Sequence, residues 1–280
     1  MLSLLNVYLT WKPDIGPTLE FATLLYDLGN YMWERGIKTA GEILQAGEDV
    51  CTLLTDLPET IPIYANLCAI GGAVQGEIGF SGRAMAREKC ERALQLRKQR
   101  VKQMEASGSL QVNDVMLLAM AWNDVGVVKI QSCEYDAALT DLEESLRLRR
   151  RYAVEDDHPW HFGETFKNLA FVRSYQGRLD EAEDLAHRAC ELCSRGMGEK
   201  SAATLKAQFI EATILWNSNK IKEALNMHKS IYRARDEVFG SKHMLTKDSL
   251  YSLGEISRLR GKMEKAEYVI ECIIARISLC

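Results

Sequence analysis

The chain has 280 residues, which is long for one compact core, because single cores stop growing at about 250–300 residues. Hydrophobic residues make up 47% and charged residues 26%, with 19 Gly and 5 Pro, which excludes a disordered or low-complexity chain and favours long helices with few breaks. The formal net charge of −4 excludes a global basic field, so an anionic partner would need a local patch.

The N-terminal segment, residues 1–11, lacks the basic start and the small-residue cleavage site of a secretory signal. The longest apolar run, residues 67–74, is far shorter than the roughly 18–20 residues that cross a bilayer. The eight cysteines are scattered through amphipathic stretches, unlike the dense cysteines of secreted disulfide scaffolds. We therefore predict a soluble protein with reduced thiols, of the cytosol or nucleus, and assign it to the cytoplasm.

An internal repeat runs along the chain. Ala182, Ala224 and Ala266 follow similar turn sequences and are evenly spaced, Ala138 precedes Ala182 by a nearly equal interval, and weaker copies of the motif lie at Ala40 and Ala86. In every copy a small residue precedes the turn residue by seven positions: Gly29 and Gly36, Gly72 and Gly79, Gly126 and Cys133, Ala170 and Gly177, Ala212 and Asn219, Gly254 and Gly261. The small residue lets a second helix approach closely, and the turn residue supplies the left-handed conformation that reverses the chain.

These registers predict six antiparallel helix pairs, at approximately residues 17–58, 59–107, 112–154, 158–197, 200–239 and 242–280. Apolar residues recur at steps of three and four, as in the second helix that contains Ala182, Leu185, Ala186, Ala189 and Cys193. Loops are expected at residues 157–159, 198–201 and 240–243. We predict an all-α fold in which residues 1–280 form a single repeat domain.

One insertion interrupts the register. The interval between the turn residues Gly79 and Cys133 is clearly longer than the interval from Cys133 to Gly177 or from Gly177 to Asn219. The stretch from residue 94 to 111 is charged and then rich in Ser and Gly, which predicts a lengthened second helix that ends in a flexible loop. The simplest interpretation is a tolerated surface insertion.

The repeat resembles the tetratricopeptide repeats, and in particular the 42-residue class of kinesin light chains and of the sensor arrays of fungal NLR-type receptors. The resemblance is clearest from residue 155 to 274, at Asp-His-Pro (157–159), Lys-Asn-Leu-Ala (167–170) and Gln-Gly-Arg-Leu-Asp-Glu-Ala-Glu (176–183). The first two units depart from it, because Gly36 is one residue closer to Ala40 and Gly79 is two residues further from Ala86. The resemblance implies a right-handed α-α superhelix, or solenoid, of about six TPR-like hairpins.

Two clusters contain residue types that could carry chemistry. Residues 155–161 (Glu-Asp-Asp-His-Pro-Trp-His) hold many metal-ligand types, but Pro separates the histidines and no third anchored pair is present, so a helix N-terminal loop is predicted. Cys190 and Cys193 have redox spacing inside a second helix, where core packing is expected. No phosphate-binding glycine loop or Gly-x-Ser-x-Gly elbow occurs. We assign no catalytic residue, no metal and no cofactor, and leave enzymatic activity open while favouring its absence.

Two basic runs lie at the ends of the second helices of units two and three: Arg92, Arg97, Lys98, Arg100 and Lys102, and then Arg147, Arg149, Arg150 and Arg151. The structural explanation is that these cations balance the partial negative charge at a helix C-terminus and lay the apolar parts of their side chains along the apolar stripe of the helix. The alternative is a patch for an acidic partner or a nucleic acid, with a steep salt dependence.

In tetratricopeptide arrays the first helices line a concave groove that holds peptides, and the resemblance carries this role to the matching positions here. The predicted groove residues are Tyr26, Asn30, Trp33, Asn123, Lys167, Phe171, Ser174, Lys206, Phe209, Trp216, Tyr251 and Arg258. Such a mixture of aromatic and basic side chains suits a peptide with acidic and apolar anchors.

The leading hypothesis is a scaffold or sensor module that binds a peptide or protein in this groove. One form of this hypothesis is that the chain is the sensing portion of a larger receptor-like protein. The alternative is a small-molecule-binding protein or unconventional enzyme whose pocket is formed by Trp33, Phe209, Trp216 and Tyr251. Nucleic-acid binding is opposed by the net charge. The last helix, with Ile270, Ile273, Ile274, Ile277 and Leu279, lacks a polar cap, which predicts self-association or a chain cut from a longer protein.

Overall fold

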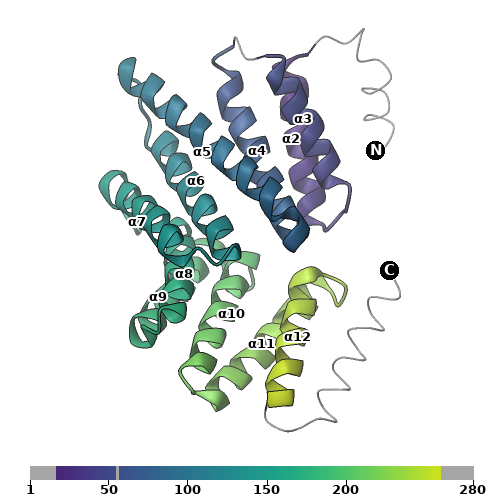
Figure 1. The fold of residues 1–280 in the computed structure, drawn as a ribbon, viewed down its shortest axis with the longest axis vertical. Coiled ribbons are helices and arrows are strands. Elements are labelled where there is room, and N and C mark those ends of the chain that lie inside the picture. Colours follow the sequence, from purple (N-terminus) through teal and green to yellow (C-terminus); the bar gives the residue numbers. More distant parts are fainter. Residues whose placement is uncertain (1–16, 55–56, 260–280) are drawn as a thin grey trace. The chain divides into compact units, whose positions relative to one another are not determined.

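The computed structural model describes residues 17–54 and 57–259, and in these ranges it consists of helices and connecting loops without a β-strand (Figure 1). The all-α prediction is confirmed. The helices are α2 (Leu19–Glu34), α3 (Ala40–Thr52), α4 (Thr60–Glu77), a short 3-10 helix η1 (Phe80–Gly82), α5 (Arg83–Ala106), α6 (Val112–Gln131), α7 (Tyr135–Tyr152), α8 (Pro159–Tyr175), α9 (Leu179–Met197), α10 (Ala202–Asn217), α11 (Ile221–Phe239) and α12 (Met244–Leu259).

The helices pair as hairpins: α2 packs against α3, α4 against α5, α6 against α7, α8 against α9 and α10 against α11. Each pair lies within one of the predicted units, and α12 occupies the place of the sixth first helix. The predicted final second helix, with Ala266 and the apolar residues up to Leu279, lies outside the described residues. The prediction of self-association through that helix therefore stays a prediction.

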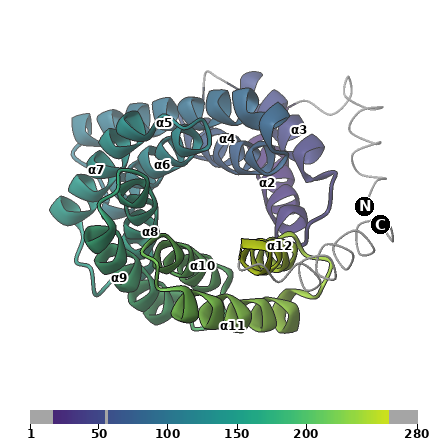
Figure 2. The same ribbon diagram turned by 60° about the horizontal axis from the view of Figure 1, so that its bottom comes forward.

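The chain divides into two compact units, residues 1–152 and 153–280. Within the first unit α2 contacts α4 and α4 contacts α6, and within the second unit α8 contacts α10. In each unit the first helices of the hairpins lie on one side and the second helices on the other (Figure 2). We call these sides the first-helix face and the second-helix face.

The predicted turns have the backbone conformation that the sequence requires. Each described turn residue has a positive φ, whether it is glycine or not: Gly36 (67°), Gly79 (87°), Cys133 (61°), Gly177 (76°) and Asn219 (61°). This left-handed conformation reverses the chain after a first helix. The sixth turn, at Gly261, lies outside the described residues.

The close approach predicted at the small residues is also present in the first unit. An added Cβ atom would lie within 3 Å of a side chain on the paired second helix, at 2.6 Å from Leu44 for Gly29, 2.6 Å from Cys90 for Gly72 and 2.9 Å from Leu142 for Gly126. Only glycine fits at that separation without a shift of the neighbouring side chain.

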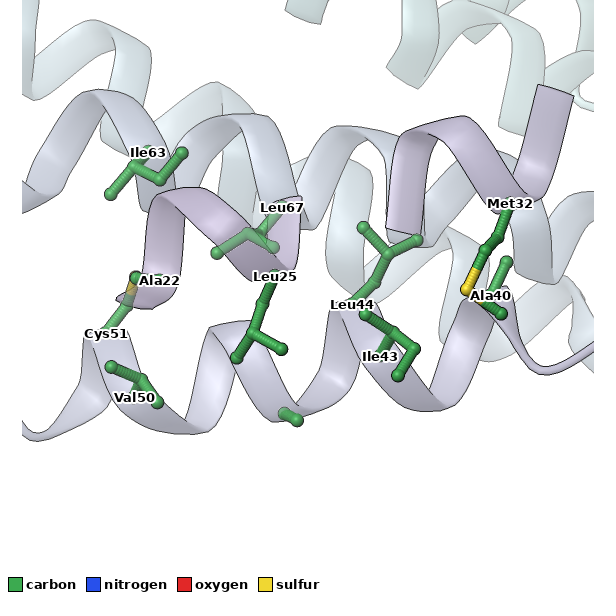
Figure 3. Packing of buried hydrophobic residues seen from close by; sticks show 11 residues of the cluster. Ala22, Leu25, Met32, Ala40, Ile43, Leu44, Val50, Cys51, Ile63 and Leu67 are labelled. Carbon is green, nitrogen blue, oxygen red and sulfur yellow. The ribbon is translucent and has the colours of Figure 1, made fainter. Parts of the chain in front are cut away.

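The repeat alanines form the centre of each hairpin's core. All the described ones are at most 2% exposed: Ala40, Ala86, Ala138, Ala182 and Ala224. In the first hairpin Leu25 and Met32 of α2 pack over Ile43, Leu44 and Val50 of α3, and Leu67 of α4 joins the same cluster (Figure 3). Because Leu67 of α4 belongs to the core cluster of the first hairpin, the stacking of these two hairpins extends one apolar layer.

Local sequence sets the helix ends. The side chain of Thr18 accepts a hydrogen bond from the backbone N–H of Phe21 at 3.2 Å, and Ser201 accepts one from Thr204 at 3.2 Å. Pro159 is the first residue of α8, where its missing N–H costs nothing. The predicted loops before α10 and α12 are confirmed, whereas the loop before α8 ends one residue earlier than predicted because Pro159 already belongs to the helix. None of the described helices is both long and apolar enough to cross a membrane.

The insertion lengthens a helix, as predicted. Helix α5 has 24 residues, whereas α7 has 18 and α9 and α11 have 19. It is followed by the short loop at residues 107–111, in which Gly108 has a φ of 65°. The extra helical residues extend beyond the register of the neighbouring second helices, which creates a surface that the other described hairpins do not have.

Candidate functional site

The predicted groove residues of the first unit belong to first helices and are mostly half-buried. Tyr26, Asn30 and Trp33 are half-buried on α2, whereas Asn123 on α6 is buried. The indole N–H of Trp33 donates a hydrogen bond to Glu77 of α4 at 3.1 Å. Burial is the main cause that raises the pKa of Tyr26. The indole of Trp33 thus connects adjacent first helices.

In the second unit the predicted residues are spread over three first helices. Lys167 is buried and Phe171 half-buried on α8, Lys206 and Trp216 are half-buried on α10, and Tyr251 is 60% exposed on α12. The Phe171 ring lies 4.9 Å from that of Tyr175, between ring centroids. Exposure thus increases from α8 to α12.

One hydrogen bond shows directly that positions on adjacent first helices face one another. The side-chain amide of Asn217 donates to the hydroxyl of Ser174 at 3.0 Å, joining α10 to α8. Ser174 is one of the predicted groove residues, whereas Asn217 is not. The sequence signal that could have identified Asn217 is its position directly after the predicted groove residue Trp216.

The cations of this face have carboxylate partners. Lys167 pairs with Glu164 at 2.6 Å, and Arg258 pairs with Glu255 at 2.9 Å. Each pair lies one turn apart on the same helix. Lys206 is close enough to Asp248 of α12 to favour the charged carboxylate, although burial is the larger effect and raises the pKa of Asp248. An acidic ligand would therefore have to compete with residues of the protein for these cations.

Phe209 lies away from the others, towards the second helix of its own hairpin. Its ring is 5.2 Å from His228 in an edge-on arrangement, and the guanidinium of Arg235 lies 4.7 Å above it. Both partners are buried on α11. Phe209 therefore packs between helices, and the cation–π contact helps to hold Arg235 in the interior.

Arg235 is the centre of a buried polar network. Its guanidinium donates to the backbone carbonyls of Leu205 at 2.9 Å and Leu245 at 2.8 Å, and to the hydroxyl of Ser249 at 2.9 Å. Burial lowers the pKa of Arg235 to about 10. Burial, and then the nearby Arg235, lower the pKa of His228 to about 4. The network joins α10, α11 and α12 in the second unit.

The cluster at residues 155–161 serves the packing of its own hairpin. Glu155 accepts two hydrogen bonds from Arg188 of α9, at 2.8 and 2.7 Å, and Asp156 pairs with Arg195 at 2.9 Å. No group of three or more metal-ligating side chains occurs among the described residues. Ion pairing of the loop with α9 accounts for these carboxylates.

The two predicted core cysteines differ in their environment. Cys193 is fully buried, and its sulfur lies 2.7 Å from the place where a Cβ of Gly163 would be. Burial raises the pKa of Cys193 to about 12. Cys190 is half-buried, and burial together with Glu211 raises the pKa of its thiol. Neither thiol has the low pKa of a reactive cysteine.

The two basic runs divide between the core and the surface. Arg97 and Arg149, at matching positions of α5 and α7, are buried, and Arg97 donates to Asn66 of α4. The exposed members include Lys98, Arg147, Arg150 and Arg151. Only part of each run is thus available to a partner.

The family model for the tetratricopeptide repeat matches residues 162–237, which include most of α8, all of α9 and α10 and most of α11. No curated protein sequence matches the chain. The family match therefore covers the region in which the repeat sequence is most regular.

Solved structures share the fold over most of the chain. BtubC (BKLC) from P. vanneervenii is 15% identical, with a TM-score of 0.59 over 85% of this chain and 90% of that one. A putative kinesin light chain with TPR-like repeats from Podosopora anserina is 15% identical, with a TM-score of 0.50 over 72% and 92%. The STAND protein PH0952 from Pyrococcus horikoshii, which has a tetratricopeptide repeat sensor, is 12% identical, with a TM-score of 0.50 over 90% and 41%.

At these identities the likeness establishes the fold and nothing about ligands. The stacked hairpins, the left-handed turns and the family match agree with one another. Residues 162–237 match the tetratricopeptide repeat, the described residues have the tetratricopeptide-repeat fold, and the likeness to kinesin light chains is distant.

Proposed function

We propose that the protein is an interaction scaffold or sensor module that binds a peptide segment of a partner protein on the first-helix face of α8, α10 and α12. The tetratricopeptide fold itself supports a role in protein interaction or sensing. The location of the bound segment is our proposal.

The observation that carries the proposal is the alignment of partly exposed aromatic and polar side chains along one face. The Asn217–Ser174 hydrogen bond ties α10 to α8 on that face. Trp216 is half-buried there, and Tyr251 on α12 is well exposed. Exposed aromatic rings with adjacent polar groups are typical anchors for a peptide.

The paired cations refine the chemistry of the expected segment. Because Lys167 and Arg258 already have carboxylate partners, the face carries little unbalanced positive charge. The aromatic side chains would therefore supply most of the affinity, and Lys206 would contribute mainly to orientation. An uncharged or weakly acidic segment with aromatic or aliphatic side chains fits this face best.

The alternative pocket of Trp33, Phe209, Trp216 and Tyr251 receives no support from the positions of its members. Phe209 packs against α11, and the indole N–H of Trp33 is bonded to Glu77 of α4. A small-molecule or enzymatic role stays a prediction, which the following experiment separates from the proposal.

The test compares the full chain with a Lys206→Glu, Tyr251→Ala double variant and with a Lys229→Glu control. Lys229 is exposed on α11, a second helix, so the control changes charge away from the first-helix face. Each protein is immobilised, exposed to lysate of the source cells, and analysed for bound proteins and metabolites by mass spectrometry. A captured protein is then divided into overlapping synthetic peptides to find the bound segment.

We expect one partner that the wild type and the control retain and the double variant loses, with at least about tenfold weaker binding of its segment. A partner that the double variant binds as well as the wild type would place binding elsewhere. A retained metabolite without a protein partner would overturn the interaction role in favour of the alternative.

A further inference from the structure

The second-helix face of the first unit contains a cleft of about 290 Å³ between α5 and α7, with α6 as its floor. Three helical stripes line it. They are Lys98, Val101 and Glu105 of α5, Val115, Leu118 and Trp122 of α6, and Glu144, Arg147, Leu148, Arg151 and Tyr152 of α7. Most neighbours within a stripe are three or four positions apart, which places them on one side of their helix.

The insertion in α5 builds one wall of this cleft. When α5 and α7 are aligned on the repeat alanines Ala86 and Ala138, the last residue of α7, Tyr152, matches Arg100, whereas α5 continues to Ala106. The lining residues at positions 101 and 105 lie in this extra length. Without it the wall would be about one to two turns shorter. The inserted residues therefore form part of the wall of the cleft and are more than a tolerated surface insertion.

The floor of the cleft is apolar. Val115, Leu118 and Leu148 are buried, and the rings of Trp122 and Tyr152 are half-buried at its sides. The volume lies just below the range of about 300–1,000 Å³ that is usual for drug-sized ligands. It therefore suits one bulky side chain of a partner better than a cofactor.

The rim carries cations that lack carboxylate partners. The ammonium of Lys98 lies 4.0 Å above the Trp122 ring, and the guanidinium of Arg151 lies 5.2 Å from the Tyr152 ring. Among the described residues neither Lys98 nor Arg151 has a carboxylate within ion-pair distance. This arrangement differs from that of the two paired cations on the first-helix face.

The other charges of the rim leave an excess of positive charge. Arg147 donates to both carboxylate oxygens of Glu144, at 2.6 and 2.7 Å, so these two charges compensate each other. The hydrogen bonds from Arg147, and more weakly the charge of Lys98, hold the pKa of Glu144 below its usual value. Glu105 is the remaining carboxylate of the lining, against the two unpaired cations.

We propose that this cleft binds an acidic peptide segment of a partner protein. One bulky aliphatic or aromatic side chain enters the apolar floor, and flanking Asp or Glu side chains reach Lys98 and Arg151. Burial of the anchor supplies affinity, and the two cations select acidic flanks. The site lies on other helices than the first-helix face of the second unit and does not rest on the function proposed there.

The same features disfavour a nucleic acid as the occupant. Bases bind to proteins by stacking on exposed aromatic faces, but the Trp122 ring is covered by Lys98. The buried floor residues Val115, Leu118 and Leu148 are aliphatic, so their side chains offer no hydrogen bond to a base edge. A single-stranded oligonucleotide is therefore a suitable competitor in the test.

The probe is a set of fluorescein-labelled nine-residue peptides with a central Leu, Ile, Phe or Trp and Asp or Glu at the flanking positions. Two matched sets replace the acidic residues by Asn and Gln, or the central residue by Gly. Binding to the full chain is measured by fluorescence anisotropy over a range of salt concentrations, with and without a nine-nucleotide single-stranded DNA.

Three variants test the site. The variant with Lys98→Glu and Arg151→Glu reverses the charges of the rim. The variant with Lys102→Glu and Arg150→Glu makes the same total charge change on the same two helices, at exposed residues that do not line the cleft. In the third variant, Val101→Trp fills the cleft. Circular dichroism and thermal unfolding establish that each variant is folded.

We expect the acidic peptides to bind, to lose at least about tenfold in affinity in the rim and cleft-filling variants, and to lose much less in the matched charge control. Both control peptide sets should bind more weakly. The proposal is overturned if the wild type binds none of the acidic peptides, if both charge variants weaken binding equally, or if the oligonucleotide binds more tightly than every peptide.

Discussion

The two units of the chain build the same hairpins but bury different polar groups. In residues 17–152 the buried Lys89 pairs with Glu48 of another helix at 2.5 Å and the buried Asp141 pairs with Lys129 of another helix at 2.5 Å, while the buried Arg97 donates to the neutral Asn66. In residues 153–259 the buried Arg235 instead donates to backbone carbonyls and a hydroxyl. The backbone pattern of the repeat is thus compatible with more than one way of satisfying a buried charge.

The two units also differ in whether the cations of their proposed binding surfaces are paired with carboxylates. On the first-helix face of residues 153–259, Lys167 and Arg258 pair with carboxylates of their own helices, whereas the cleft of residues 17–152 leaves Lys98 and Arg151 over aromatic rings. Unpaired cations attract acidic groups more strongly than paired ones do, because no internal carboxylate has to be displaced. We therefore propose an aromatic-driven site in one unit and a charge-selective site in the other.

The largest expected effect concerns the small residue of the first helices, which is Gly72 in α4 but Ala170 in α8. Because a Cβ at Gly72 would lie 2.6 Å from the sulfur of Cys90, Gly72→Leu should lower the free energy of unfolding by about 3 kcal/mol. Chemical denaturation measures the change. Gly41→Ala is the control, since its Cβ would make an ordinary contact with Val74 at 3.4 Å. Equal stability of the Gly72→Leu variant and the wild type would contradict the close approach of α4 and α5.

Replacing the buried cation of the second unit should have an effect almost as large. Arg235→Met removes three hydrogen bonds from a charged donor and leaves the carbonyls of Leu205 and Leu245 without that donor, so we expect a loss of about 2–3 kcal/mol. Urea denaturation measures it. Arg233→Met on the exposed side of the same helix should change stability by less than about 0.5 kcal/mol. Similar losses in both variants would show that the network does not stabilise the unit.

Acid should destabilise the second unit through His228. The pKa of His228 is lowered from 6.5 to about 4 in the folded state, so the unfolded state binds the proton more readily and stability falls as the pH drops from 6.5 towards 4. We expect the wild type to lose about 2–3 kcal/mol over this window relative to His228→Gln. The exposed His187, changed to Gln, serves as the control. A wild type and His228→Gln variant with parallel pH profiles would refute the assignment.

The first unit should respond to pH with the opposite sign and more weakly. Residues 1–152 contain no histidine, but burial raises the pKa of Glu48 above 4.5, although Lys89 opposes the shift. The folded state therefore holds this proton more tightly, and its contribution to stability is lost as the pH rises from 4.5 through the raised pKa. The stability of the wild type relative to Glu48→Gln should fall over that window, as measured by urea denaturation at a series of pH values. A stability of the wild type that rises with pH relative to the Glu48→Gln variant would contradict this prediction.

Much of the fold could be predicted because the repeat imposes local requirements. A residue that must adopt a positive φ is visible as Gly or Asn at a fixed place, and Cys133 was identified by register although its side chain does not favour that conformation. The alanines were identifiable because close helix packing allows only small side chains at those positions. Both signals depend on backbone geometry, which recurs from unit to unit.

The candidate sites could be predicted only in part. Register placed Tyr251 and Trp216 on the first-helix face, but it could not show that Phe209 turns towards His228 and Arg235, because the rotamer of Phe209 depends on the residues of α11. Register could not show which residues of the basic runs are buried and which are exposed either. In α5, for example, Arg97 is buried whereas the adjacent Lys98 is exposed.

The sequence by itself determined that the chain is a series of helical hairpins, where they turn, and that the helix after Gly79 is longer than its counterparts. These features follow from spacing and from the conformational limits of single residues. Only the tertiary structure decided that this extra length, together with α6 and α7, encloses an apolar cleft with unpaired cations at its rim. Such a cleft depends on side chains of three helices that meet in space, and no local pattern in the chain encodes their meeting.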